Sequence, residues 1–144
     1  MHKIKAYQYE YSISLPISLH DCDAMGIVWH GNYLKFFEIA REGLFSEHNL
    51  DYHQLEDTGY IYPVIEEQIR YRKAVSVHTK SIRVRAYLLE LYNRIKLGYE
   101  VFDDHEELCS FGYTVQVAVT PKTFELCLIT PPCFSDNFTD FKEV

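Results

Sequence analysis

The stretch from Asn32 to Asn49, NYLKFFEIAREGLFSEHN, decides the class of fold that we expect. Its apolar residues recur at steps of three and four, and charged residues fall between them. This spacing places the apolar side chains on one face of a helix, the longest predicted in the chain. Asn32 is expected to be its N-cap, because a short polar side chain can accept a backbone N–H of the first turn. The apolar stripe comprises Tyr33, Phe36, Phe37, Ala40, Leu44 and Phe45.

Segments in which apolar and polar residues alternate lie on both sides of this helix. Such alternation is typical of half-buried strands. One predicted strand precedes the helix and four follow it, and Asp103 to Glu106 is predicted to form the turn between the last two. The apolar positions of the five strands run from Tyr7 to Ile17, Ile69 to Tyr71, Ile82 to Leu88, Ile95 to Val101 and Phe111 to Val119.

Two further segments have weaker helical signals. The polar stretch Asp51 to Gly59 is compatible with one more helical piece after the long helix. Between Pro131 and Val144, Phe134, Phe138 and Phe141 recur at helical steps, which indicates a short terminal helix laid on the sheet.

A strand, a long helix and then four consecutive strands indicate an α+β protein. An antiparallel five-stranded sheet wrapped round one long central helix would bury the helix stripe and the apolar side of every strand at once. This arrangement is the hotdog fold. A chain of 144 residues fits a single domain, residues 1–144, whose core needs neither disulfides nor a metal.

The composition and charge of the chain argue against several classes of protein. The net charge of -7 argues against a general nucleic-acid binder, which needs a surplus of cations to neutralise phosphates. No apolar run is long enough for a membrane span, and the polar start has no signal core, so we expect a cytoplasmic protein. The cysteines lack the spacings of a zinc site and are interpreted as reduced thiols. They are Cys22, Cys109, Cys127 and Cys133.

The connection from Leu19 to Tyr33, LHDCDAMGIVWHGNY, carries two carboxylates, two histidines and two glycines just ahead of the long helix. The unpaired N–H groups at a helix start favour negative charge, and aimed at a carbonyl they form an oxyanion hole. Asp23 or Asp21 could then attack that carbonyl or draw a proton from water. These are the parts that acyl-transfer chemistry requires.

The residues from Asp21 to Arg41, DCDAMGIVWHGNYLKFFEIAR, resemble the signature of the 4-hydroxybenzoyl-CoA thioesterase family, including its YbgC-like branch. The order of strands and helix fits that family over nearly the whole chain. The resemblance implies an acyl-CoA thioesterase in which Asp23 is the nucleophile or general base. It implies that the backbone N–H of His30 polarises the thioester carbonyl, and in YbgC-like members a histidine side chain at this position is also catalytic.

The resemblance also implies a homo-oligomer, a dimer or a dimer of dimers, with active sites at the subunit interface. Neither a metal nor a cofactor is expected, since coenzyme A is part of the substrate. Trp29 is the preferred candidate for the acyl pocket, and Gly31 and Asn32 lie at the helix start that the substrate would approach. Lys73 and Arg94, near strand ends, are the candidates for binding the phosphates of coenzyme A.

The sequence departs from the YbgC-like pattern at several places. A site tyrosine four positions before the catalytic aspartate is replaced by Leu19, so any role that needs that phenol is lost. Ala74 stands where a proline is usual, and His78-Thr79 stands in place of a pair of aspartates. The family's substrate preference therefore does not carry over to this chain.

Other interpretations stay open. Loop aspartates often only cap turns, and we assign that structural role to Asp21. Cys22 is assigned to packing, because its acidic neighbours disfavour a thiolate. His20, Asp21, Asp23 and His30 match no familiar metal-ligand spacing. The functional alternatives are a thioesterase for acyl carrier protein and a hotdog scaffold that binds an acyl ligand or a partner without turnover.

Overall fold

The computed structural model describes residues 1–144 and contains the predicted strand, long helix and four later strands in that order. Two helices beyond the long one also form, close to where the sequence places them. The elements are β1 (Glu10–Pro16), the 3-10 helix η1 (Leu19–Asp21), α1 (Asn32–Glu47), α2 (Tyr52–Asp57), β2 (Val64–Tyr71), β3 (Ser81–Glu90), β4 (Ile95–Phe102), β5 (Leu108–Gln116) and α3 (Pro132–Asn137).

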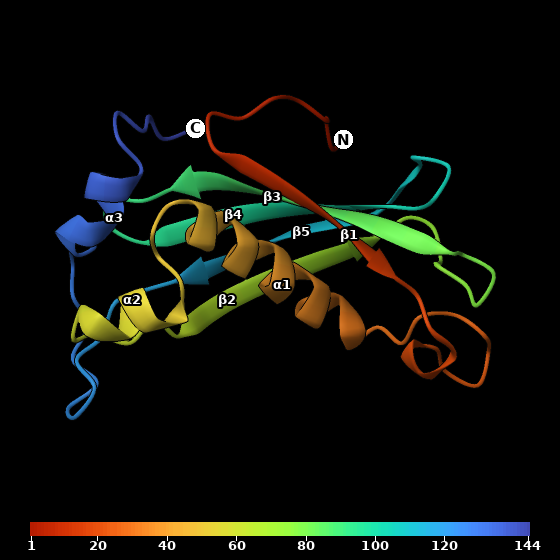
Figure 1. Ribbon diagram of the computed structural model, residues 1–144, viewed down its shortest axis with the longest axis horizontal. Helices are drawn as coiled ribbons and strands as arrows, with labels where there is room; N and C mark the ends of the chain where they lie inside the picture. Colours follow the sequence, from red (N-terminus) through yellow and green to blue (C-terminus); the bar gives the residue numbers. More distant parts are fainter.

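All five strands form one antiparallel sheet in the order β1-β3-β4-β5-β2. The sheet curves round α1, which lies across one face, and β1 and β2 form the two edges (Figure 1). This is the hotdog fold, as predicted. The η1 loop and the connection from β2 to β3 lie at one end of the sheet, and α3 lies at the other (Figure 1).

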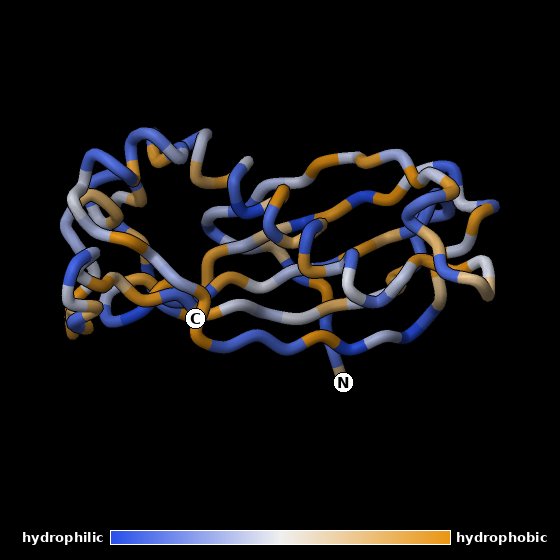
Figure 2. The backbone as a smooth tube through the Cα atoms, turned by 90° about the horizontal axis from the view of Figure 1, so that it is seen from below, coloured by the Kyte–Doolittle hydropathy of each residue, from blue (hydrophilic) through white to orange (hydrophobic).

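The core lies between α1 and the sheet. Phe37 stacks flat on Tyr99 of β4 with ring centroids 4.4 Å apart, and Ala40 and Leu44 are fully buried. Figure 2 shows hydrophobic and hydrophilic residues interspersed along the strands, as expected where one face of a sheet is buried. Apolar burial on this face is the main stabilising contribution to the fold.

β5 departs from the prediction that the apolar side of every strand faces the helix. Tyr99 faces α1, and its cross-strand partner on β5 is Gly112, so the alternate residues Phe111 and Tyr113 lie on the outer face. The helix-facing positions of β5 are instead small or polar. The strand also ends earlier than predicted, at Gln116, and Val119 makes only isolated bridges. The helix-facing positions are Ser110, Gly112, Thr114 and Gln116.

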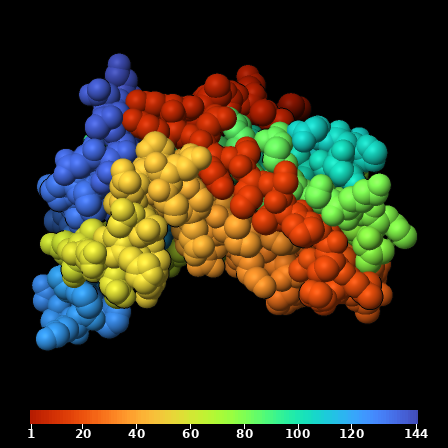
Figure 3. Space-filling view, in the orientation of Figure 1, coloured from red at the N-terminus to blue at the C-terminus, as the bar shows by residue number.

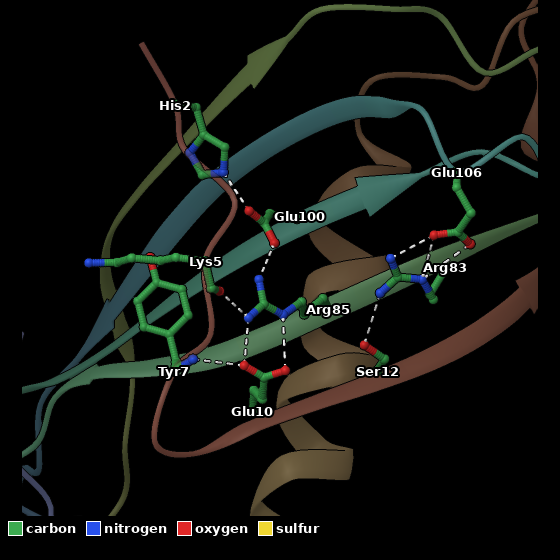
Figure 4. A network of polar contacts seen from close by, with 9 residues as sticks. All are labelled: His2, Lys5, Tyr7, Glu10, Ser12, Arg83, Arg85, Glu100 and Glu106. Carbon is green, nitrogen blue, oxygen red and sulfur yellow. Dashed lines mark hydrogen bonds and ion pairs between the residues drawn. The ribbon is translucent and has the colours of Figure 1, made fainter.

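The outer face of the sheet carries a buried polar network (Figure 4). Glu100, which is fully buried, accepts a hydrogen bond from Arg85 at 2.6 Å and contacts His2 at 2.5 Å. His2 belongs to the N-terminal segment and stacks on Phe111 at 4.1 Å. The N-terminal segment therefore covers Phe111, one of the apolar residues that β5 turns away from the helix.

The short helices close the end of the core away from η1. Asp51 caps α2, accepting from the Gln54 N–H at 2.8 Å while the Gln54 side chain accepts from the Asp51 N–H. Phe134, Phe138 and Phe141, in and after α3, are buried in the core, as their helical spacing predicted. No helix combines the length and apolar character needed to cross a membrane.

Candidate active site

Asp23 sits in a tight turn that leads into α1. Its Oδ1 accepts the backbone N–H of Met25 at 2.9 Å and that of Ile27 at 3.4 Å, and Gly26 supplies the positive φ of 77° that the turn requires. The other carboxylate oxygen, Oδ2, makes no hydrogen bond within the chain. The turn thus orients the carboxylate and leaves one oxygen for a ligand.

The segment between β2 and β3 holds this loop in place. The N–H of Val28 donates to the carbonyl of Val75 at 2.7 Å, and the N–H of Val77 donates to the carbonyl of Gly26 at 3.0 Å. These bonds tie both sides of the turn to one neighbouring segment. Backbone contacts therefore position the turn that carries the Asp23 carboxylate.

Asp21 and Asn32 connect the loop to the helix. Asp21 Oδ2 accepts from the Ser18 N–H at 2.9 Å, and the Asp21 carbonyl accepts from Asn32 Nδ2 at 2.8 Å. The structural role assigned to Asp21 agrees with these contacts. The predicted N-cap is wrong: Gly31 is the N-cap residue, and Asn32 is already the first residue of α1. The Asn32 side chain donates to the loop rather than accepting from the helix.

The backbone N–H groups of His30 and Gly31 make no hydrogen bond within the chain. The next two N–H groups are paired, since Asn32 donates to the Trp29 carbonyl at 2.9 Å and Tyr33 to the His30 carbonyl at 3.4 Å. The start of α1 therefore presents two consecutive free donors at the positive end of the helix. Such a pair suits a developing oxyanion.

A cavity of about 370 Å³ gathers part of the predicted site. Asp23, His30 and Lys73 line it, whereas Trp29, Gly31 and Asn32 do not. The other contributors come from the loop, the first turn of α1 and the end of β2. They are Met25, Ile27, Val28, Tyr33, Tyr71, Arg72 and Ala74.

Trp29 and Gly31 contact each other. A Cβ built on Gly31 would come within 2.2 Å of the Trp29 ring, so the indole occupies the space over this glycine. Trp29 itself is 51% exposed, and its ring lies 5.2 Å from that of His30. We predicted Gly31 as a point of close approach for substrate; in this structure the approach is made by Trp29.

Tyr71 lines the cavity but was not among the predicted site residues. Its hydroxyl donates to the His30 carbonyl at 3.3 Å, and its ring packs edge-on against Tyr33 at 5.1 Å. Leu19, in the place of the family's tyrosine, is 78% exposed and does not line the cavity. A phenol is thus present beside the helix start after all, contributed by β2. The sequence signal for Tyr71 is its match to the tyrosine of the Tyr-x-x-Pro-Ala region in the family that the chain resembles.

Burial, chiefly, raises the pKa of the Tyr33 hydroxyl to about 12, so this phenol stays protonated at neutral pH. Burial, with the nearby carboxylates of Asp21 and Asp23, also raises the pKa of the Cys22 thiol. A thiolate nucleophile at Cys22 is therefore disfavoured, in line with its assignment to packing.

The two predicted phosphate-binding cations are both engaged. Lys73 donates to Asp103 at 2.9 Å and to Glu107 at 2.7 Å, and these bonds raise the pKa of its ammonium group. Arg94 pairs with Glu90 through two bonds of 3.0 Å, in the β3–β4 turn at the opposite end of the sheet from Asp23 (Figure 1). Arg72, which lines the cavity without an ion pair, is the better placed cation.

The model of the thioesterase-like superfamily matches residues 17–131, which is well over half of the chain and includes the whole loop described above. This chain belongs to that superfamily. The thioesterase-like superfamily match spans the sequence from the end of β1 to the segment before α3, so it covers the helix and four of the five strands in full.

Individual relatives agree with this assignment. The chain is 30% identical over 107 residues to "Putative acyl-CoA thioesterase YneP" of Bacillus subtilis (strain 168), covering 73% of this chain and 76% of the relative. It is 26% identical to a DHNA-CoA thioesterase from Staphylococcus aureus, with a TM-score of 0.77 and coverage of 83% and 80%.

A more distant structure supports the fold. The complex of a 4-hydroxybenzoyl-CoA thioesterase mutant with 4-hydroxybenzoyl-CoA has a TM-score of 0.79 at 15% identity, covering 91% of this chain and 99% of the other. The family match and the acyl-CoA thioesterase relative, rather than this structure, confirm the predicted relationship at the level of the family.

Proposed function

We propose that the protein hydrolyses the thioester of an acyl-CoA to a free acid and coenzyme A. The observation that carries this proposal is one juxtaposition. Asp23 and His30 line a single cavity, and at the adjoining start of α1 the N–H groups of His30 and Gly31 have no partner in the chain. A base or nucleophile next to two free donors is what acyl transfer to water needs.

In the proposed reaction the thioester oxygen accepts from the N–H groups of His30 and Gly31. Asp23 Oδ2 either attacks the carbonyl carbon or takes a proton from the water that does so. The new C–O bond forms as the C–S bond breaks, and the sulfur leaves as the thiol of coenzyme A after taking up a proton. If Asp23 attacks, water then hydrolyses the resulting anhydride. Neither route requires a metal or a further cofactor.

We further propose that the working enzyme is a dimer or a dimer of dimers. β2 is an edge strand whose outer edge has no partner in the chain, and most of its side chains are exposed. Tyr71, at the end of β2, also lines the Asp23 cavity. A second subunit that covers this edge would therefore reach the site.

The test is free-thiol release from short, medium, long and aromatic acyl-CoAs by the wild type, Asp23→Asn and Asp57→Asn. Asp57 is an exposed aspartate at the end of α2, so the same substitution there controls for the loss of one charge. We expect the folded Asp23 variant to lose roughly 10²- to 10⁴-fold in kcat, with Asp57→Asn unchanged. Equal rates for all three proteins would contradict the role of Asp23. No turnover by the wild type would favour the carrier-protein thioesterase or the scaffold.

A further inference from the structure

A groove of about 750 Å³ lies along the second half of α1 and shares no lining residue with the Asp23 cavity. Its walls come from α1, α2, the residues that lead into β2, and the end of β5. In Figure 3 the surface is hollowed between α2 and α1. The groove mixes aromatic and apolar residues with a few polar groups, as ligand pockets do.

Gln116 of β5 lines this groove, and its side-chain oxygen has no hydrogen-bond partner. The side chain is nearly buried, with 5% of the residue exposed, and its Nε2 donates to the Tyr62 carbonyl at 2.8 Å. That bond determines the amide orientation, because a carbonyl can only accept. Oε1 is then buried without any hydrogen-bond partner. A buried acceptor without a donor is costly, so this atom favours a ligand that brings one.

Arg41 supplies donors in the same groove. It is 9% exposed, and its nearest carboxylate, that of Glu38, lies 3.5 Å away and is itself largely exposed. A guanidinium has five N–H donors, and one long ion pair leaves most of them available. The groove therefore offers both an acceptor and several donors from nearly buried side chains.

The rim determines the charge of the ligand. Four carboxylates line the groove against the single guanidinium of Arg41, so an anion would be repelled. A carboxylate also has no proton to donate to Gln116 Oε1. A neutral hydroxyl satisfies both requirements, since it donates to Gln116 and accepts from Arg41. The four carboxylates are Glu38, Glu42, Asp51 and Glu56.

One face of α1 connects this groove with the active site. Leu34, Glu38, Arg41 and Phe45 follow one another at steps of four, three and four residues and so form one stripe along the helix. Leu34 is 37% exposed, and in the sequence it stands between Tyr33, which lines the Asp23 cavity, and Glu38, which lines the groove. From Asn32, Arg41 lies about 14 Å along the helix, by the rise of 1.5 Å per residue.

We propose that the acyl group of the substrate runs from the Asp23 cavity along this stripe and carries a hydroxyl at its far end, which pairs with Gln116 and Arg41. The substrate class is then a medium-chain ω-hydroxyacyl thioester. This inference rests on the proposed thioesterase function and adds the chemistry of the acyl group.

The first experiment compares kcat/KM for ω-hydroxydecanoyl-CoA, decanoyl-CoA and the ω-carboxy analogue in the wild type, Gln116→Met and Gln68→Met. Gln68 is an exposed glutamine on β2 outside both sites, so it provides the matched control. We expect the wild type and Gln68→Met to prefer the hydroxylated substrate by on the order of tenfold over either competitor. Gln116→Met should lose the preference, whereas Gln68→Met should keep it. Equal kcat/KM values in the wild type, or a preference that survives in Gln116→Met, would overturn the proposal.

A second measurement separates this inference from turnover. Calorimetry with decanol and with decyl methyl ether compares two probes of similar apolar surface, of which only the alcohol can donate. We expect the wild type to bind the alcohol more tightly by on the order of tenfold and Gln116→Met to bind both probes alike. Equal binding by the wild type would overturn the groove assignment even if acyl-CoAs are hydrolysed. A clear preference without hydrolysis would keep the assignment and reject the proposed activity.

Discussion

Polar groups on the outer face of the sheet and polar groups at the start of α1 differ in whether they have partners within the chain. On the outer face, Arg85 bonds to Glu100, to Glu10 and to the Lys5 carbonyl, and Glu100 also contacts His2 (Figure 4). At the start of α1, the N–H groups of His30 and Gly31 have no partner. On the outer face, these polar groups form their hydrogen bonds with other groups of the chain. At the start of α1, the two N–H groups are free to pair with water or a ligand.

We infer that this difference separates groups that hold the fold from groups that would bind a ligand under the proposed function. Buried ions are tolerated when every one is paired, and removing one partner leaves an uncompensated charge. Free donors at a helix start are tolerated at the surface, where water pairs with them until a ligand arrives. Variants on the outer face should therefore change stability, and variants at the helix start should change activity.

The largest effect is expected for Glu100→Ala. It removes the 2.6 Å partner of the nearly buried Arg85, which keeps its pair with Glu10, and we expect a loss of about 1.5–3 kcal/mol in the free energy of unfolding. Urea denaturation of the variant and the wild type measures it. Glu106→Ala is the control, because its pair with Arg83 lies at the surface and should be worth less than about 1 kcal/mol. Equal losses in the two variants would break the distinction between the paired network and the surface.

The next effect concerns the ion pair between Lys73 and Asp103. Lys73 lines the Asp23 cavity, but its ammonium group is paired with carboxylates, as Arg85 is on the outer face. Its bonds, and then two backbone N–H groups, lower the pKa of Asp103 to about 2. A carboxyl whose pKa is lower in the folded state stabilises the protein above its ordinary pKa, and that contribution is lost as pH falls from about 4 towards 2. Asp103→Asn should reduce the melting temperature at pH 7 and show a smaller acid-induced fall than the wild type. Parallel curves from pH 7 to pH 2 would contradict this.

A smaller effect is expected for Tyr71→Phe, which removes the hydroxyl that donates to the His30 carbonyl. Losing one neutral hydrogen bond should reduce kcat/KM by roughly three- to tenfold, with no change in unfolding free energy beyond about 0.5 kcal/mol. Tyr113→Phe, on the outer face, is the control and should leave kcat/KM unchanged. A stability loss in Tyr71→Phe without an activity loss would assign Tyr71 to the fold rather than to the site.

Local patterns predicted much of this molecule correctly. The helical stripe around Phe37 and Leu44, the five alternating strands and the three phenylalanines near the C-terminus all depend on spacing along the chain. The dense loop before α1 was predicted for the same reason, since Asp23 and His30 lie close together in the sequence as well as beside one cavity. The N-cap was misplaced by one residue, since α1 begins at Asn32 itself, and the Asn32 side chain donates to the Asp21 carbonyl, a contact that only the folded loop supplies.

What the sequence by itself determined is therefore the set of elements, the hotdog order and the loop that carries Asp23, because periodicity and short-range turns are local properties. Only the tertiary structure decided which face of β5 meets the helix, since Phe111 alternates like a core residue but is covered by His2 of the N-terminal segment. Only the tertiary structure brought Tyr71 to His30 and separated Arg94 from Asp23, because strand pairing places residues by register and not by distance along the chain.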